Sequence, residues 1–371
     1  MSFEKLHEYL EKTIPCNVIP GCDVLVYHKG ELVYREQFGY SDYFKQQSVD
    51  PEEHYILYSC SKVVTCSAVL HLVEEGKLGL DDPVAKYLPA FADVTLKDGS
   101  RPKTVMTVRH LFTMTSGLNY DLKAPAICEA LRQNPDADTV TLANAMAKTP
   151  LSFEPGTHYQ YSLSHDILAA IAEVITGKTF EAYVSEWIFQ PLGLTEIAYN
   201  FNDNNRKKLV AQYMANGNGD SITPMGGECA YIFSKNYYSG GAGMIGRAED
   251  YTKILSALSQ GKLLKKETLD LMKTNQLDDT CLQDLRKTAW LKAHGYGLGV
   301  RTLMHPEMLD NTAPAGEFGW DGAAGSYALV DSDREIAIGY FQQVRNCMYA
   351  YNVVHPNIRT LVYEALGYTF K

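Results

Sequence analysis

Ser59 and Lys62 are the residues whose types and spacing best suit chemistry. They stand three positions apart, and on a helix this spacing places both side chains on one face. A buried lysine loses affinity for its proton and can accept the proton of a serine hydroxyl. A serine at the start of a helix also lies near backbone N–H groups that stabilise an oxyanion. The pair therefore predicts a serine nucleophile that is transiently acylated.

The Ser-x-x-Lys spacing alone is weak, because the chain contains it four times: Ser2/Lys5, Ser59/Lys62, Ser100/Lys103 and Ser259/Lys262. The first pair lies in the opening residues, where chains are poorly ordered. Pro102 indicates a loop after Ser100, and Gly261 indicates the end of a helix after Ser259. Only Ser59 stands between an apolar extended run and a strongly apolar helix. Without further context, a helix-capping role for Ser59 is an equal alternative.

The elements that must position this pair follow from apolar periodicity. Residues 55–58 form a short extended run, and residues 59–75 carry apolar side chains at helical spacing, with Gly76 as a C-cap. An amphipathic helix is expected near residues 3–10. Two runs, 22–27 and 32–35, flank a Lys-Gly turn and predict a β-hairpin.

Strand signals lie at both ends of the chain and helices in its middle. Further helices are expected at 108–114, 166–175, 180–187, 250–258 and 357–366, and strands at 296–302, 326–330 and 336–342. This order predicts an α+β protein with a sheet built from both chain ends. Residues 1–76 and 236–371 would form the subdomain with the sheet, and residues 77–235 a mostly helical one, with the active site between them.

Several segments together resemble the serine β-lactamase and penicillin-binding-protein superfamily, in particular its class C-like branch and the esterases of that fold. The matching segments, in chain order, are Tyr58-Ser59-Cys60-Ser61-Lys62, Leu78-Gly79-Leu80-Asp81-Asp82-Pro83-Val84, Thr107 to Leu111, Thr115-Ser116-Gly117-Leu118, Glu154-Pro155-Gly156, Tyr161-Ser162, Pro191 to Leu194, Ser239 to Gly243 with Ala248-Glu249-Asp250, and Gly319-Trp320-Asp321-Gly322. Their common order over residues 20–345 is specific, although each is short. The resemblance implies a β-lactamase/DD-peptidase-like fold, mainly antiparallel.

The resemblance also implies partners for Ser59. Tyr161 matches the tyrosine that serves as a second acid/base group in the family. Trp320-Asp321-Gly322 matches the strand that edges the site, with Gly322 allowing close approach of the backbone to the substrate. Ala323 matches the position whose N–H, with that of Ser59, forms the oxyanion hole.

Two departures from the family pattern concern the substrate. Leu163 stands where asparagine is common, and Trp320 stands where lysine or histidine is common. Neither can bond a substrate amide or carboxylate as the usual residue does. This predicts a small, neutral carboxylic ester as substrate, although Leu163 and Trp320 could instead be packing residues. Tyr238 is a further candidate for the pocket lining.

Some motifs are set aside. Gly241 to Gly246 fits G-x-G-x-x-G, but no buried strand precedes it, so a glycine turn beside the site explains it better than a dinucleotide site. No G-x-S-x-G elbow and no H-E-x-x-H zinc helix occurs. We expect no metal and no cofactor. Asp121 and Asp166 are interpreted as helix-capping or solvent-facing groups.

The composition of the chain argues against some classes of binding partner. The 371 residues have a net charge of -10 and contain no basic run, which argues against nucleic acid. The first residues form no apolar run like that of a signal peptide or membrane span, and the eight cysteines are scattered. We therefore expect reduced thiols, a cytoplasmic location and a small-molecule acyl substrate. The sequence does not indicate an oligomeric state.

Alternatives to an esterase remain open at this point. The same residues would serve an acyltransferase or a hydrolase of amides or D-amino-acid peptides, with weak β-lactamase activity as a side reaction. A protein that keeps the fold as a catalytically silent binding protein is a third possibility, which the presence of Ser59, Lys62 and Tyr161 argues against.

Overall fold

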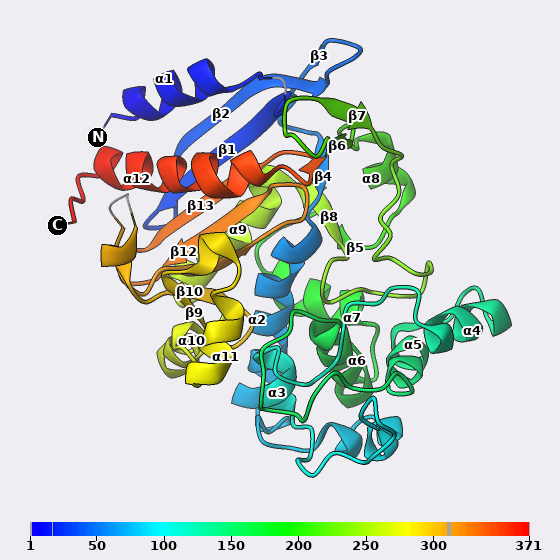
Figure 1. The fold of residues 1–371 in the computed structure, drawn as a ribbon. Helices are drawn as coiled ribbons and strands as arrows, with labels where there is room; N and C mark the ends of the chain where they lie inside the picture. Colours follow the sequence, from blue (N-terminus) through cyan, green and yellow to red (C-terminus); the bar gives the residue numbers. More distant parts are fainter. Residues whose placement is uncertain (1, 17, 310–312, 371) are drawn as a thin grey trace.

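The computed structural model describes residues 2–16, 18–309 and 313–370, which fold around an antiparallel sheet of eight strands (Figure 1). Their order across the sheet is β3 (Gln47–Ser48), β2 (Glu31–Asp42), β1 (Gly21–His28), β13 (Ile336–Phe341), β12 (Tyr327–Asp331), β11 (Phe318–Asp321), β10 (Arg301–Leu303) and β9 (His294–Tyr296). In the middle, β1 pairs with β13 and places Leu25 opposite Gly339. The expected sheet built from both chain ends is confirmed.

Alternation along β1 explains why helices cover both faces of the sheet. Val24 and Val26 join the core beneath α1 (Glu4–Thr13) and α12 (His355–Ala365), which lie side by side in Figure 1. Leu25 and Tyr27, which point the other way, join the larger core that contains α9 (Ala248–Ser259). Fully buried apolar side chains on both faces thus hold the sheet between two helical layers.

The region between the two parts of the sheet is rich in helices, as expected, but also contains short strands. Its helices are α3 (Val108–Phe112), α4 (Pro125–Gln133), α5 (Thr139–Met146), α6 (Ser164–Thr176), α7 (Phe180–Val184) and α8 (Asp203–Lys207); its strands are β5 (Ile197–Tyr199), β6 (Tyr213–Ala215) and β7 (Ile222–Pro224). β7 pairs with β6, whereas β5 and β6 also pair with strands from outside the region. β5 pairs with β8 (Met244–Arg247), β8 with β4 (His54–Ile56), and β6 with β14 (Val344–Arg345).

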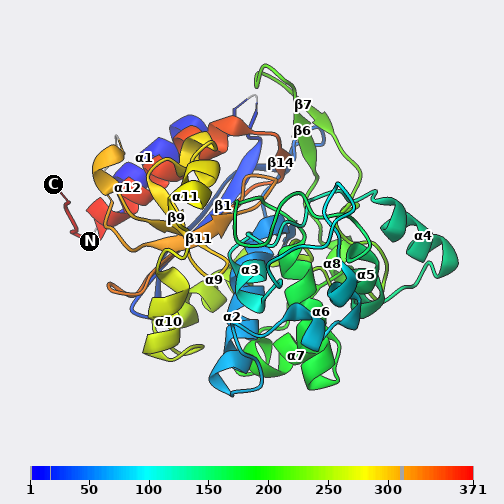
Figure 2. The ribbon, with the colours of Figure 1, turned by 60° about the horizontal axis from the view of Figure 1, so that its bottom comes forward.

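The predicted helix after Ser59 is α2 (Ser61–Glu74), which packs against α6 (Figure 2). Nearly all of α2 is buried, including the polar residues Lys62, Thr65 and Ser67, so the helix lies in the interior of the protein. Gly76 has a φ of +68°, as its expected role past the helix end requires. Two further helices, α10 (Lys266–Lys273) and α11 (Asp279–Leu285), lie before the last strands.

The strand predicted over residues 296–302 is wrong. β9 ends at Tyr296 and β10 begins at Arg301, with a turn between them in which Gly297 N–H donates to Val300 O at 2.8 Å. Gly299 adopts a φ of +88°, which no β-branched residue would tolerate and which ends the first strand. An apolar run with two glycines was thus a hairpin rather than one strand.

All eight cysteines are free thiols in this fold. Within the described ranges, no helix has the length and apolar character needed to cross a membrane. The cytoplasmic location stays a prediction.

Candidate active site

Ser59 lies on a strained turn between β4 and α2. Tyr58, the residue before it, has a φ of +47°, a left-handed conformation that is costly for a bulky side chain. Two hydrogen bonds hold it there: Tyr58 Oη donates to Gln212 Oε1 at 2.5 Å, and Ser61 Oγ donates to Tyr58 O at 2.6 Å. The turn presents Ser59, which is 8% exposed, at the start of the helix. Backbone strain at this position is typical of a functional site.

Lys62 follows one turn later and points back at the serine. Its Nζ lies 3.1 Å from Ser59 Oγ and donates to Gly241 O at 2.6 Å. The side chain is fully buried, and burial lowers the pKa of Lys62 to about 7, although the carboxylate of Asp166 acts in the opposite direction. Near neutral pH a large share of this amine is therefore unprotonated and can accept a proton.

Tyr161 completes the group around Ser59. Its Oη donates to Ser59 Oγ at 2.6 Å and accepts a hydrogen bond from Trp320 Nε1 at 3.1 Å. The ring is stacked between Tyr120 and Trp320, with centroid distances of 5.3 and 5.5 Å. Burial raises the pKa of Tyr161 well above its ordinary value, so the phenol keeps its proton and is a donor. Lys62, predicted from the same segment as Ser59, and Tyr161, predicted from another, thus both contact Ser59 Oγ.

The backbone beside Ser59 provides two free donors. Among the residues that the structure describes, the N–H groups of Ser59 and Ala323 have no hydrogen-bond acceptor. A side chain on Gly322 would place its Cβ 2.6 Å from Leu57 O, so glycine lets the end of β11 approach the chain that leads to Ser59. Close approach at Gly322 was expected, but the partner is the protein's own backbone. The arrangement suits two N–H groups that stabilise an oxyanion.

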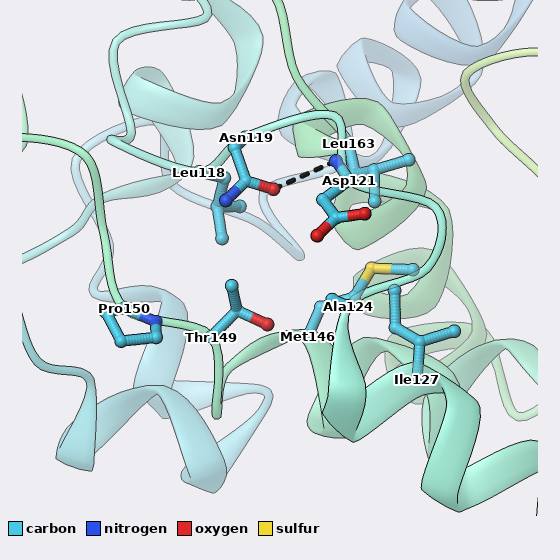
Figure 3. A pocket seen from close by; sticks show the side chains of 9 residues that line it. All are labelled: Leu118, Asn119, Asp121, Ala124, Ile127, Met146, Thr149, Pro150 and Leu163. Carbon is cyan, nitrogen blue, oxygen red and sulfur yellow. Dashed lines mark hydrogen bonds between the residues drawn. The ribbon is translucent and has the colours of Figure 1, made fainter. Parts of the chain in front are cut away.

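Leu163 lies apart from the contacts around Ser59 Oγ. It is 5% exposed and lines a narrow pocket with Leu118, Asn119, Asp121, Ala124, Ile127, Met146, Thr149 and Pro150 (Figure 3). Its backbone N–H donates to Asn119 O at 3.1 Å, which ties the start of α6 to the loop before Tyr120. This placement favours the packing alternative for Leu163.

Asp321 and Tyr238 also point elsewhere. The Asp321 carboxylate lies 3.3 Å from Arg301 Nη1 in a buried ion pair. The Tyr238 hydroxyl faces Thr179 at the start of α7, and its backbone N–H donates to Thr139. In the described residues, neither side chain has a hydrogen bond to Ser59, Lys62 or Tyr161.

The glycine turn at Gly241 belongs to the site. Its carbonyl oxygen receives the Lys62 hydrogen bond, and β8 follows it. This bears out the interpretation of the G-x-G-x-x-G match as a turn beside the site.

Two residues near the site were missed. Tyr120 stacks on Tyr161, and its only signal in the sequence was its position just after the matched Thr-Ser-Gly-Leu segment. Asp166 was expected to cap a helix or face solvent, but it is 1% exposed and lies close enough to Lys62 to affect its pKa. It does stand in the first turn of α6, where a carboxylate is favourable. Asp121 is exposed and accepts a hydrogen bond from Lys123 N–H in a turn, as expected.

Known proteins resemble this chain in sequence and in fold. A family model described as Beta-lactamase matches residues 10–346. Esterase EstB of Burkholderia gladioli is 31% identical over 335 residues, which cover 84% of this chain and 82% of the relative. Acyltransferase calJ of Penicillium decumbens is 29% identical over 350 residues, covering 84% and 81%. The solved structure of EstCE1, described as a hydrolase with promiscuous acyltransferase activity, has a TM-score of 0.81 at 26% identity and covers 97% of this chain and 98% of its own.

Proposed function

This chain belongs to the Beta-lactamase family, and from that premise we propose that it is a serine hydrolase that forms an acyl-enzyme at Ser59 and cleaves small neutral carboxylic esters. The observation that carries the proposal is the contact of Ser59 Oγ with two proton-transfer groups, Lys62 Nζ at 3.1 Å and Tyr161 Oη at 2.6 Å. A serine that only caps a helix would need neither of these two contacts. The family relation to an esterase supports hydrolysis as the reaction class.

In the reaction we envisage, Ser59 Oγ attacks the carbonyl carbon and its proton moves to the neutral amine of Lys62. The N–H groups of Ser59 and Ala323 stabilise the oxyanion. Tyr161 gives its proton to the oxygen of the leaving alcohol, and the Trp320 indole N–H stabilises the phenolate that results. Lys62 then returns a proton to Tyr161. Water enters, attacks the acyl carbon and releases the acid, and Ser59 regains its proton.

The preference for a neutral substrate rests on Trp320. Its indole lies where the resemblance places a lysine or histidine and is 8% exposed. Its single N–H donates a hydrogen bond to Tyr161 Oη. It therefore offers no charge to a substrate carboxylate. Leu163 does not enter this argument, because it lines the pocket of Figure 3, whose lining residues do not include Ser59, Lys62 or Tyr161.

The test is turnover of short-chain p-nitrophenyl esters, together with labelling of Ser59 by a fluorophosphonate probe located by peptide mass spectrometry. We expect turnover and a single labelled serine in the wild type, and neither in Ser59→Ala. The matched control is Ser100→Ala, which removes the serine of another Ser-x-x-Lys segment and should keep full activity. Equal turnover by wild type and Ser59→Ala would contradict the proposal.

Acyl transfer is a second candidate because two of the proteins that resemble this chain carry that activity in their names. The acyl-enzyme would then be attacked by an alcohol or amine instead of water. Product analysis after adding a small alcohol separates the two: ester exchange that exceeds hydrolysis would favour the transferase.

A further inference from the structure

A buried carboxylate near Lys62 has one oxygen that the fold leaves unpaired. Asp166 Oδ1 accepts hydrogen bonds from Tyr237 Oη at 2.7 Å and Ser239 Oγ at 2.6 Å. Oδ2 is equally buried and has no hydrogen-bond partner among the described residues. Burying an unpaired carboxylate oxygen is costly, so such an atom is rare unless it has a use.

Lys62 has the complementary deficit. A protonated lysine carries three N–H donors, but Nζ has two acceptors here, Ser59 Oγ and Gly241 O. A Cβ built on Gly241 would lie 2.6 Å from Asp166 Oδ2 and 3.4 Å from Lys62 Nζ. Asp166 Oδ2 and Lys62 Nζ therefore both border the space that a side chain at position 241 would fill. Because residue 241 is glycine, no side chain lies between the carboxylate and the amine there. Tyr120 Oη also lies 3.4 Å from that point.

We propose that Asp166 is a positioning residue of this site, whose free Oδ2 stabilises the ammonium ion that Lys62 becomes when it accepts the Ser59 proton. The inference rests on the proposed function, since it assigns Lys62 as the base. The proton moves from Ser59 Oγ to Lys62 Nζ as the bond from Oγ to the acyl carbon forms, and Asp166 keeps its charge throughout. Asp166, Lys62 and Ser59 thus form a relay in which a carboxylate supports the base.

The groups around the two partners are consistent with this role. The titratable groups that face Lys62 or Asp166 are Cys60, Cys66, Tyr120, Tyr161, His165, Tyr199 and Tyr237. Burial raises the pKa of the two thiols and of these tyrosines and lowers that of His165 to about 3, so all are neutral near pH 7. Among them only Asp166 has an ordinary pKa well below 7. Burial raises the pKa of Asp166, whereas hydrogen bonds from Ser239 and Tyr237 and the charge of Lys62 act to lower it, and the proposal assigns the one negative charge of this group to its carboxylate. Its field raises the pKa of Lys62 against the larger effect of burial.

The test is the pH dependence of fluorophosphonate labelling at Ser59, which reports acylation alone. In the wild type the labelling rate should rise with pH through a midpoint of about 7, as Lys62 loses its proton. In Asp166→Asn, which keeps the shape, the midpoint should fall by at least about one pH unit and the plateau rate by about tenfold or more. The matched control is His165→Gln, an equally buried neighbour that is neutral in this range; its midpoint should match the wild type.

A slower plateau with an unchanged midpoint in Asp166→Asn would show a merely structural role and overturn the proposal. Gly241→Ala provides a second test if Asp166→Asn does not fold, because its Cβ, 2.6 Å from Oδ2, would push the carboxylate away from the amine while both groups remain in the chain. It should lower the midpoint too, and an unchanged midpoint there would also contradict the inference. Failure of the wild type to be labelled at Ser59 would instead reject the proposed function.

Discussion

At the scale of single residues, Ser59 Oγ contacts two groups with opposite tasks. Burial lowers the pKa of Lys62 to about 7 and raises that of Tyr161, so one is ready to accept a proton and the other to donate one. Trp320 acts on the second of these through its bond to Tyr161 Oη. Trp320 thus donates its N–H to the group that we propose as the acid.

Trp320→Phe isolates that bond, because phenylalanine can keep the stacking on Tyr161 and the edge contact with Tyr296 but has no N–H. We expect kcat for a neutral ester to fall about tenfold, the effect of losing a hydrogen bond of about 1.4 kcal/mol in the transition state, with KM changed little. Trp187→Phe is the control, since Trp187 stacks on His71 and not on Tyr161. Unchanged kcat in Trp320→Phe would show that the bond has no catalytic role.

The sequence predicted the residues that local rules govern. Ser59 and Lys62 are neighbours on one helix turn, and their spacing in the sequence is enough to predict this contact. Asp166 was misread because its partners, Lys62, Tyr237 and Ser239, come from distant segments. Helix position alone suggested a cap, and no pattern in one sequence reveals which carboxylate the fold will bury. Tyr161 could be assigned only through the order of the matched segments.

At the scale of elements, the sequence predicted helices and strands where periodicity was long. The first helix, the hairpin at Lys29-Gly30 and α9 appear as expected, because each has a continuous apolar face. The short strands β5 to β7 were not predicted. Each has three residues, and β5 and β6 gain hydrogen-bond partners from β8 and β14, far away in the chain. These short segments are strands only because they form hydrogen bonds with neighbouring strands, which the sequence of each segment does not reveal.

The junction of α6 and α7 contains a carboxyl group whose charge opposes folding. Glu173 Oε1 accepts a hydrogen bond from Phe180 N–H at 2.8 Å, and burial raises the pKa of Glu173 to about 7. The folded state therefore holds this proton more tightly than the unfolded state, and the stability from this site is lost as pH rises through about 7. We predict that Glu173→Gln, which keeps an acceptor without a charge, raises the denaturant midpoint at pH 8 and leaves it nearly unchanged at pH 5.

Glu129→Gln is the matched control for that comparison, because Glu129 is an exposed partner of Arg132 on α4. It should change the midpoint little at either pH. Equal effects of Glu173→Gln at pH 5 and pH 8 would show that packing, and not the charge of Glu173, determines the difference.

At the scale of the whole molecule, the site depends on segments from across the chain. Residues 58–62, 161–166, 239–241 and 320–323 each contribute a group, and the sheet that holds the last of them is completed by strands from both chain ends. No segment carries the site alone. The C-terminal helix α12 packs in one core with β12 and β13, and β12 pairs with β11, which leads to Ala323.

One buried ion pair connects α12 with the approach to β11. Arg359 Nη1 lies 3.0 Å from Glu317 Oε1, and both side chains are about 5% exposed. Removing one partner leaves an uncompensated charge in the core, so we predict that Arg359→Met lowers the free energy of unfolding by about 3–5 kcal/mol. Glu317→Leu added to Arg359→Met should recover most of this loss, because neither member of the pair is then left buried without its partner. Thermal and denaturant unfolding of the single and double variants measures both effects, with Arg101→Met, which breaks the exposed pair with Asp93, as the control expected to change little. A double variant no more stable than Arg359→Met would show that lost packing, not the unpaired Glu317, weakens the attachment of α12 to the sheet.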